Sequence, residues 1–200
     1  GDETHAYRND DGVDPNSITE TFVAAKLMFD NYRWSGVPFY VRTGKKLADK
    51  FTRIDVVFKK PLIDIFANPR MKSEQSLNSN VLTIFVEPNS GFSLRLNAKR
   101  AGQGFTTEPV DLKYLQSDEA KNESPEPYER LFHDALEGNH TNFASWAEIA
   151  YAWKFVDVIR KLWDIEEPQF PNYTPGSMGP AASDELLARD GRQWVYHLNH

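Results

Sequence analysis

Apolar and polar side chains alternate through the middle of the chain. Five segments show this period of two: residues 36–42, 51–60, 80–87, 92–98 and 110–115. Such alternation is typical of strands that bury one face. The turn at 88–91 lies between two of these segments and predicts a β-hairpin, and Pro38 indicates that the first strand begins late or lies at a sheet edge. Because short turns join the strands, we expect a largely antiparallel sheet with one face free for helices or a partner.

A helical period precedes the strands. Ser17 and Glu20 have the spacing of a capping box, which predicts a helix from there to about Asn31. The apolar face of this helix would consist of Phe22, Ala25, Met28 and Phe29. Residues 1–16 are rich in Asp and Gly and show no period, so we expect an irregular lead-in there.

Three helices are predicted after the strands. Pro127 at a first turn and Gly138 as a stop bound the first of them. Ser145 and Glu148 form a second capping box that opens a longer helix. Its apolar stripe, expected to be core or interface, is Trp146, Ile149, Ala150, Trp153, Val156 and Leu162 or Trp163. After a loop at 168–180, Ser183 would cap a short third helix.

These elements predict an α+β fold, in which a large, mainly antiparallel β-sheet has helices packed on one face. We assign residues 17–200 to one such domain.

Composition narrows the class of protein. The 200 residues are 40% hydrophobic and 13% aromatic, enough for a firm core, which excludes disorder over most of the chain. The net charge of −6 disfavours a nucleic-acid-binding surface, and the lack of cysteine excludes disulfides and thiolate metal sites. No segment has the pattern of a membrane span or a signal peptide, so we expect a cytoplasmic protein with neither membrane nor nucleic-acid partners.

Positive charge is concentrated in one short region. Residues 42–60 hold seven basic and two acidic side chains, a local charge of +5, which leaves −11 for the remainder. Gly44 allows a sharp turn there, so Arg42, Lys45 and Lys50 could converge on one small anion such as a phosphate monoester. The alternative is a basic strand end that is simply solvated. The segment is not a P-loop, since the second glycine and the Lys-Ser/Thr pair are missing.

Other familiar chemistry is absent from the sequence. The five histidines, which are His5, His133, His140, His197 and His200, lack metal-ligand spacing, and we expect no metal site. His133 and its neighbour Asp134 would face different sides of a helix, so His133 is expected to be structural, whereas His197 and His200 resemble a disordered end. There is no G-x-S-x-G and no G-x-G-x-x-G, so a nucleophile elbow and a dinucleotide fingerprint are both missing.

Several blocks of the chain resemble a known family. They are TETFVAAKLMFDNYRWSGVPFYVRTGKKLADKFTRIDVVFKK, NAKRAG, PEPYERLFHDALEGNHTNFASW, AWKFVD and GSMGPAASDELLARDGRQW. In this order they are similar to the C-terminal half of glucose-6-phosphate dehydrogenase, in the version found in lactic-acid bacteria. The resemblance implies oxidation of glucose 6-phosphate at C1 to the lactone, with NADP as hydride acceptor. It also implies that Lys45 and Lys50 contact the substrate and that the sheet forms a homodimer.

The resemblance has limits that change what this chain is expected to do. The Rossmann domain that binds NADP or NAD, the DHYLGKE block and the general-base histidine all lie upstream of this segment in the family. We therefore expect no catalytic and no cofactor-binding residue here, and no activity from the chain alone. A stand-alone sugar-phosphate-binding or dimerisation module is the alternative, and the irregular start at Gly1 argues against it.

Two positions depart from the family. Glu87 stands where many relatives have a glutamine near the sugar, and its role stays open. Phe51, Asp55 and Phe85 replace basic residues that hold a second, structural NADP in some animal members, so no such site is expected.

Overall fold

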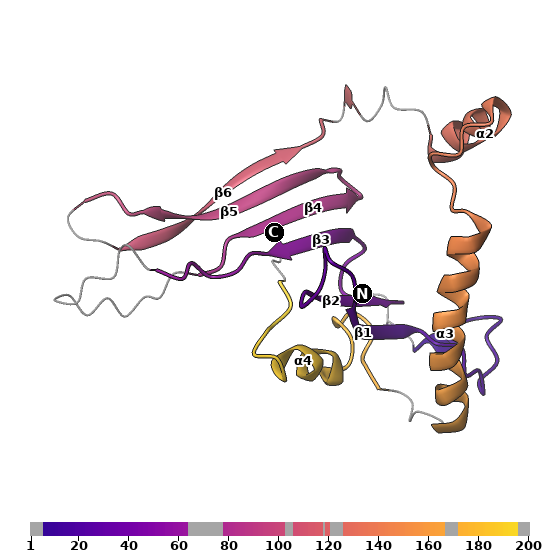
Figure 1. Ribbon diagram of the computed structural model, residues 1–200. Coiled ribbons are helices and arrows are strands. Elements are labelled where there is room, and N and C mark those ends of the chain that lie inside the picture. Colours follow the sequence, from indigo (N-terminus) through magenta and orange to yellow (C-terminus); the bar gives the residue numbers. More distant parts are fainter. Residues whose placement is uncertain are drawn as a thin grey trace. The chain divides into compact units, whose positions relative to one another are not determined.

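The computed structural model describes residues 6–63, 78–102, 106–117, 119–120, 126–166 and 172–195. The chain divides into two compact units, one formed by Gly1–Gln116 with Tyr173–His200 and the other by Ser117–Asn172 (Figure 1). The predictions for His5, His197 and His200 lie outside the described residues. Among the described residues, no helix is long and apolar enough to cross a membrane.

Four antiparallel strands form the main sheet of the first unit. They are β3 (Thr52–Val57), β4 (Val81–Glu87), β5 (Gly91–Lys99) and β6 (Thr107–Leu115), in that order across the sheet (Figure 1). Ile84 pairs with Phe92, which in turn pairs with Tyr114, so the apolar positions of successive strands share one face. The predicted strands, the hairpin and the antiparallel arrangement are confirmed.

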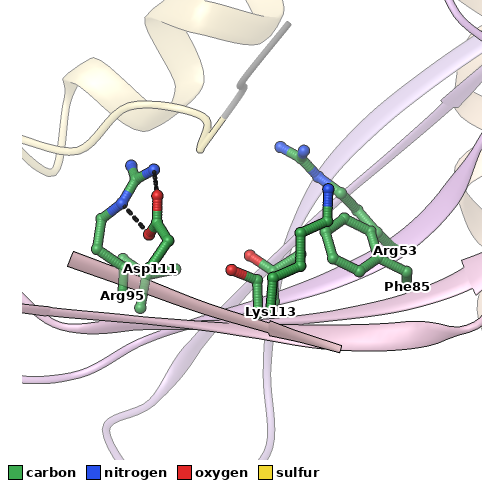
Figure 2. A pocket seen from close by; sticks show the side chains of 8 residues that line it. Arg53, Phe85, Arg95, Asp111 and Lys113 are labelled. Carbon is green, nitrogen blue, oxygen red and sulfur yellow. Dashed lines mark hydrogen bonds and ion pairs between the residues drawn. The ribbon is translucent and has the colours of Figure 1, made fainter. Parts of the chain in front are cut away.

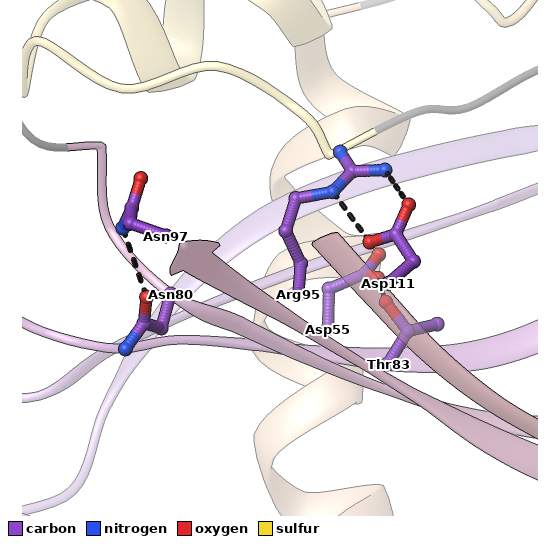
Figure 3. Close-up of polar contacts among 6 residues, drawn as sticks. All are labelled: Asp55, Asn80, Thr83, Arg95, Asn97 and Asp111. Atoms are coloured by element: carbon purple, nitrogen blue, oxygen red, sulfur yellow. Dashed lines mark hydrogen bonds and ion pairs between the residues drawn. The ribbon is translucent and has the colours of Figure 1, made fainter. Parts of the chain in front are cut away.

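The two faces of this sheet differ in an unexpected way. On the apolar face Ile54 is 54% exposed, Leu112 55% and Tyr114 57%, so the described residues of the first unit leave this face open. The opposite face carries Asp55, Thr83, Arg95 and Asp111 and is better covered, with Thr83 only 8% exposed (Figure 3). The alternation identified the faces correctly, but within the first unit the polar face is the better covered one.

Paired polar side chains hold the second face together. The Thr83 hydroxyl donates to Asp55 Oδ1 at 2.7 Å, and Arg95 binds both oxygens of Asp111 at 2.7 and 2.8 Å (Figure 3). The hydrogen bonds that Arg95 donates to Asp111, opposed by partial desolvation, raise the pKa of the Arg95 guanidinium. These contacts give the polar side chains on the covered face of the sheet their hydrogen-bond partners.

A second, two-stranded sheet precedes the main one and corrects the first helix prediction. Residues Phe22–Met28 form strand β1, which pairs antiparallel with β2 (Pro38–Gly44). The Ser17 side chain bonds to Thr19 within the loop and opens no helix. The segment contains helix formers, but pairing with β2 overrides local propensity. Strand β2 begins at Pro38, as the proline predicted, because the first strand residue can lack a ladder donor.

Phe22 joins the two-stranded sheet of β1 and β2, which we call the ribbon, to the segment that begins at Tyr173. Its ring lies 5.5 Å from the ring of Tyr173, measured between centroids. Two glycines leave room for it: a Cβ at Gly44 would lie 2.7 Å from Phe22 Cδ2, and one at Gly179 would lie 2.2 Å from Phe22 Cε2. Because contacts surround the ring, it cannot easily move aside.

Helix α4 (Ala181–Ala188) lies against β1. It begins after Pro180, two residues before the expected cap at Ser183. Ser183 is buried inside the helix, and its carbonyl accepts a hydrogen bond from the Trp194 indole at 3.2 Å. The prediction of a Ser183 cap is therefore wrong, because Pro180 is the N-cap residue and its carbonyl oxygen accepts the Ser183 amide at 2.9 Å.

A charged group anchors the end of α4 to the ribbon. Lys26 and Tyr40 are paired across β1 and β2, and both bind the Asp190 carboxylate, with the Lys26 ammonium at 2.6 Å. Hydrogen bonds from Lys26 and, to a smaller extent, from Tyr40 lower the pKa of the Asp190 carboxyl. The contact with Asp190 raises the pKa of Lys26.

The second unit contains α2 (Pro127–Glu137) and α3 (Trp146–Glu166). Gly138 ends α2 with φ of 70°, and the Ser145–Glu148 capping box is present, with bonds of 2.6 and 3.3 Å. His133 is exposed and Asp134 is buried, as expected for neighbours on a helix. No residue of α3 is buried, so its apolar stripe forms no core within the described residues of its own unit, and its role as core or interface stays a prediction.

We expect Gly179→Ala to destabilise the protein by about 2–5 kcal/mol, through its φ of +106° and the clash with Phe22. Gly176→Ala is the control, because its φ is +79° but a Cβ there meets open space; it should cost only about 1–2 kcal/mol. Urea unfolding compares the two variants. An equal decrease in the free energy of unfolding for both variants would mean that the contact with Phe22 does not contribute.

We expect Asp190→Asn to be less stable than the parent at pH 6 and to approach it as the pH falls to 3. The pKa of the Asp190 carboxyl is lower in the folded state than its unfolded value of about 3.9. The carboxylate therefore stabilises the fold above about pH 4, and this stabilisation is lost as the pH falls through the folded-state pKa. Melting temperatures at several pH values measure the difference. Asp157→Asn, at an exposed position of α3, is the control and should show a constant offset.

Candidate functional site

The basic region lies immediately after strand β2. The strand ends at Gly44, and residues 45–50 form the loop that follows; we call these residues the lysine loop. The amide of Lys45 donates to the carbonyl oxygen of Thr21 at 2.8 Å, which extends the β1–β2 pairing by one step. The ribbon therefore fixes where the loop begins.

Three cations of the basic region are engaged within the protein. The Arg42 guanidinium lies over the Trp194 ring at 4.5 Å and donates to the carbonyl of Met178 at 3.4 Å. Lys46 binds Asp10 at 2.5 Å, and Arg53 binds Asp55 at 3.0 Å. Arg42 was expected to converge on an anion with the two lysines, but the structure turns its charge to Trp194.

Lys45 and Lys50 remain available. Both are exposed, and within the part of the chain that the structure describes neither ammonium group forms an ion pair with a carboxylate. Lys59 and Lys60 are exposed too but follow β3, so Lys45 and Lys50 are the cations of the lysine loop that are free to meet a ligand. An exposed lysine without a partner gives up no internal contact when it binds an anion.

A distant segment holds the backbone of the lysine loop. The Gly176 amide donates to the Lys46 carbonyl at 2.8 Å, and the Ala48 amide donates to the Ser177 carbonyl at 2.9 Å. The Tyr173 hydroxyl lies 2.9 Å from the Lys45 carbonyl oxygen. The sequence predicts only a loop at 168–180, and no local pattern marks the contacts of residues 173–177 with residues 45–48.

A second polar cluster lies on the covered face of the main sheet. Arg53, Phe85, Arg95, Asp111 and Lys113 line a cavity of about 80 Å³ (Figure 2). Arg95 binds Asp111 and Arg53 binds Asp55, whereas Lys113 lies over the Phe85 ring at 5.7 Å. A cavity of this size holds a few water molecules. The sequence signal for this cluster was charged residues at alternate positions of three strands, and the prediction did not use it.

The remaining candidates bring no further chemistry together. Among the described residues, no group of three His, Asp or Glu side chains could hold a metal ion. His133 is exposed and lies 3.6 Å from Glu137 on the same helix. Glu87 is exposed at the end of β4.

Comparison with known proteins identifies the family of this chain. The family model for the glucose-6-phosphate dehydrogenase C-terminal domain matches residues 1–195. The chain belongs to this family. The resemblance inferred from the residue blocks is thereby confirmed for the C-terminal domain of glucose-6-phosphate dehydrogenase.

Curated relatives in this family come from several bacteria. Glucose-6-phosphate 1-dehydrogenase of Bacillus subtilis (strain 168) is 47% identical over 189 residues, covering 94% of this chain and 38% of the relative. The enzyme of Leuconostoc mesenteroides is 44% identical, covering 95% of this chain and 38% of its own length. The chain thus spans about two fifths of the glucose-6-phosphate dehydrogenases that it matches, and the similarity extends beyond lactic-acid bacteria.

Solved structures of the family share the fold. A glucose-6-phosphate dehydrogenase in complex with its substrate glucose-6-phosphate matches with a TM-score of 0.78 and 31% identity, over 96% of this chain and 38% of that one. The glucose-6-phosphate 1-dehydrogenase of Mycobacterium avium matches with a TM-score of 0.76 and 28% identity, over 97% and 39% of the two chains. The α+β arrangement with antiparallel strands is the fold of these domains.

Proposed function

We propose that this chain is the substrate-binding and dimerisation part of a glucose-6-phosphate dehydrogenase. The enzyme would oxidise glucose 6-phosphate at C1 to 6-phosphoglucono-lactone in the cytoplasm. The observation that carries this proposal is the pair of unengaged lysines, Lys45 and Lys50, on an anchored loop of a family member. Residues 17–200 would form the domain, with residues 1–16 leading into it.

The two lysines suit the phosphate of the substrate. A phosphate monoester carries close to two negative charges at neutral pH, and two ammonium groups match that charge. Each ammonium is a compact cation on a flexible stem, so it can follow the ligand and release it after turnover. Arg42 and Lys46 would support the loop, because their charges are already engaged with Trp194 and Asp10.

The nicotinamide cofactor has no recognition motif in this chain. The sequence lacks the G-x-G-x-x-G turn that holds the pyrophosphate of a dinucleotide. NADP or NAD would be held by another part of the enzyme. The residues described here would bind and orient the sugar phosphate, and no step of hydride transfer is assigned to them.

We further propose a homodimer formed through the main sheet. The apolar face that the first unit leaves open, with Ile54, Leu112 and Tyr114 all more than half exposed, supports an assembly in which a partner covers part of the sheet. Four strands offer a continuous surface of the kind that stable interfaces need.

In the full-length enzyme, we expect Lys45→Ala and Lys50→Ala each to raise the KM for glucose 6-phosphate about 10- to 100-fold. Each removes a charge-assisted contact, for which about 1.5–3 kcal/mol is typical. The KM for the cofactor should stay within about twofold, because its binding groups lie elsewhere. Steady-state kinetics with each substrate varied in turn measures both constants.

Lys60→Ala is the matched control for charge. It removes the same charge from an exposed position beyond β3, and the substrate KM should not change. If Lys45→Ala weakened cofactor binding and left the substrate KM unaltered, the assignment of the lysine loop would be wrong.

We expect one of two neighbouring substitutions on β6 to convert the dimer into a monomer. Leu112→Asp changes the apolar face and Lys113→Glu changes the polar face of the same strand. A charge that is misplaced inside an interface cannot be compensated, so the variant on the contacting face should dissociate. Light scattering gives the mass and circular dichroism verifies the fold. Two folded, fully dimeric variants would contradict a dimer through the sheet.

A further inference from the structure

The lysine loop depends on one side chain that the proposed substrate contact does not include. The Tyr173 hydroxyl lies 2.9 Å from the Lys45 carbonyl oxygen and 3.2 Å from that of Thr21. The same Thr21 carbonyl accepts the Lys45 amide at 2.8 Å. Both backbone hydrogen-bonding groups of Lys45 are therefore occupied, one by the ribbon and one by the tyrosine.

The place of this bond in the ribbon explains why a side chain makes it. Strand pairing ends where Phe22 meets Gly44, so the carbonyl of Lys45 lies one residue past the last ladder position. A carbonyl there has no strand neighbour to donate to it. The tyrosine brings in a donor from a segment 128 residues away in sequence.

The tyrosine itself is held independently of its hydroxyl. Its ring lies 5.5 Å from that of Phe22, and backbone bonds of Gly176 and Ser177 to the lysine loop hold the chain that follows it. Loss of the hydroxyl alone would leave the ring and the neighbouring segment in place. The change would fall on the Lys45 backbone.

We propose that Tyr173 is a positioning residue for Lys45: its hydroxyl fixes the backbone from which the phosphate-binding ammonium group extends. The inference rests on the substrate role proposed above for Lys45. A lysine side chain loses much rotamer freedom when it binds, and a fixed backbone limits the further freedom that binding must remove. Without the bond, the ammonium group meets the phosphate less often in the right place.

The test is Tyr173→Phe in the full-length enzyme, which removes the hydroxyl and keeps the ring. We expect the KM for glucose 6-phosphate to rise about three- to tenfold, the effect of losing one ordinary hydrogen bond. The kcat, the cofactor KM and the melting temperature should stay close to the parent values. Tyr40→Phe is the matched control, because it removes a hydroxyl bonded to Asp190 in the same ribbon, away from the lysine loop.

A double-mutant cycle shows whether Tyr173 acts through Lys45. In the Lys45→Ala background, Tyr173→Phe should add little to the substrate KM, because the group that it positions is already gone. Equal effects in both backgrounds, no effect of Tyr173→Phe, or the same rise in Tyr40→Phe would each overturn the positioning role. If Lys45→Ala itself left the substrate KM unchanged, the proposed function would fail first, so the two failures are distinguishable.

Discussion

The candidate site depends on backbone hydrogen bonds between the lysine loop and the segment that begins at Tyr173. The loop has left the strand ladder, so its polar groups need partners from elsewhere. Gly176 and Ser177 provide backbone partners, and Tyr173 provides a hydroxyl. These contacts place Lys45 and Lys50 on a fixed frame, while Asp10 and Trp194 engage the neighbouring cations. Charge that the sequence concentrates in one region is thus divided by the fold into supporting and available groups.

Elements with local signals could be predicted from the sequence. Alternation along β3 to β6 identified the strands and their faces, and the box of Ser145 and Glu148 opened α3 as expected. The prediction failed where distant partners decide the structure. Residues 22–28 have a helical pattern but pair with β2, and the apolar stripe of α3 finds no core within the described residues of its own unit. Local sequence cannot show either fact.

The site was predicted only in part. The charge cluster and the family resemblance both pointed to Lys45 and Lys50, but neither indicated that Arg42 would lie over Trp194 or that Lys46 would bind Asp10. Trp194 lies 152 positions from Arg42 in the sequence, and Asp10 lies 36 positions from Lys46. Tyr173 was missed for the same reason, since a tyrosine in a proline- and glycine-rich loop carries no sign of the carbonyl that it will meet.

The division of the first unit into two stretches of sequence bears on how the protein folds. Residues of the second unit come between the lysine loop and the segment that completes it, so the contact from Tyr173 to Lys45 closes 128 positions of chain. Contacts of such high sequence separation form late, because loop-closure entropy opposes them until much of the structure is in place. During synthesis the strands β1 to β6 are made first, and the lysine loop acquires its final form only after the tyrosine has followed.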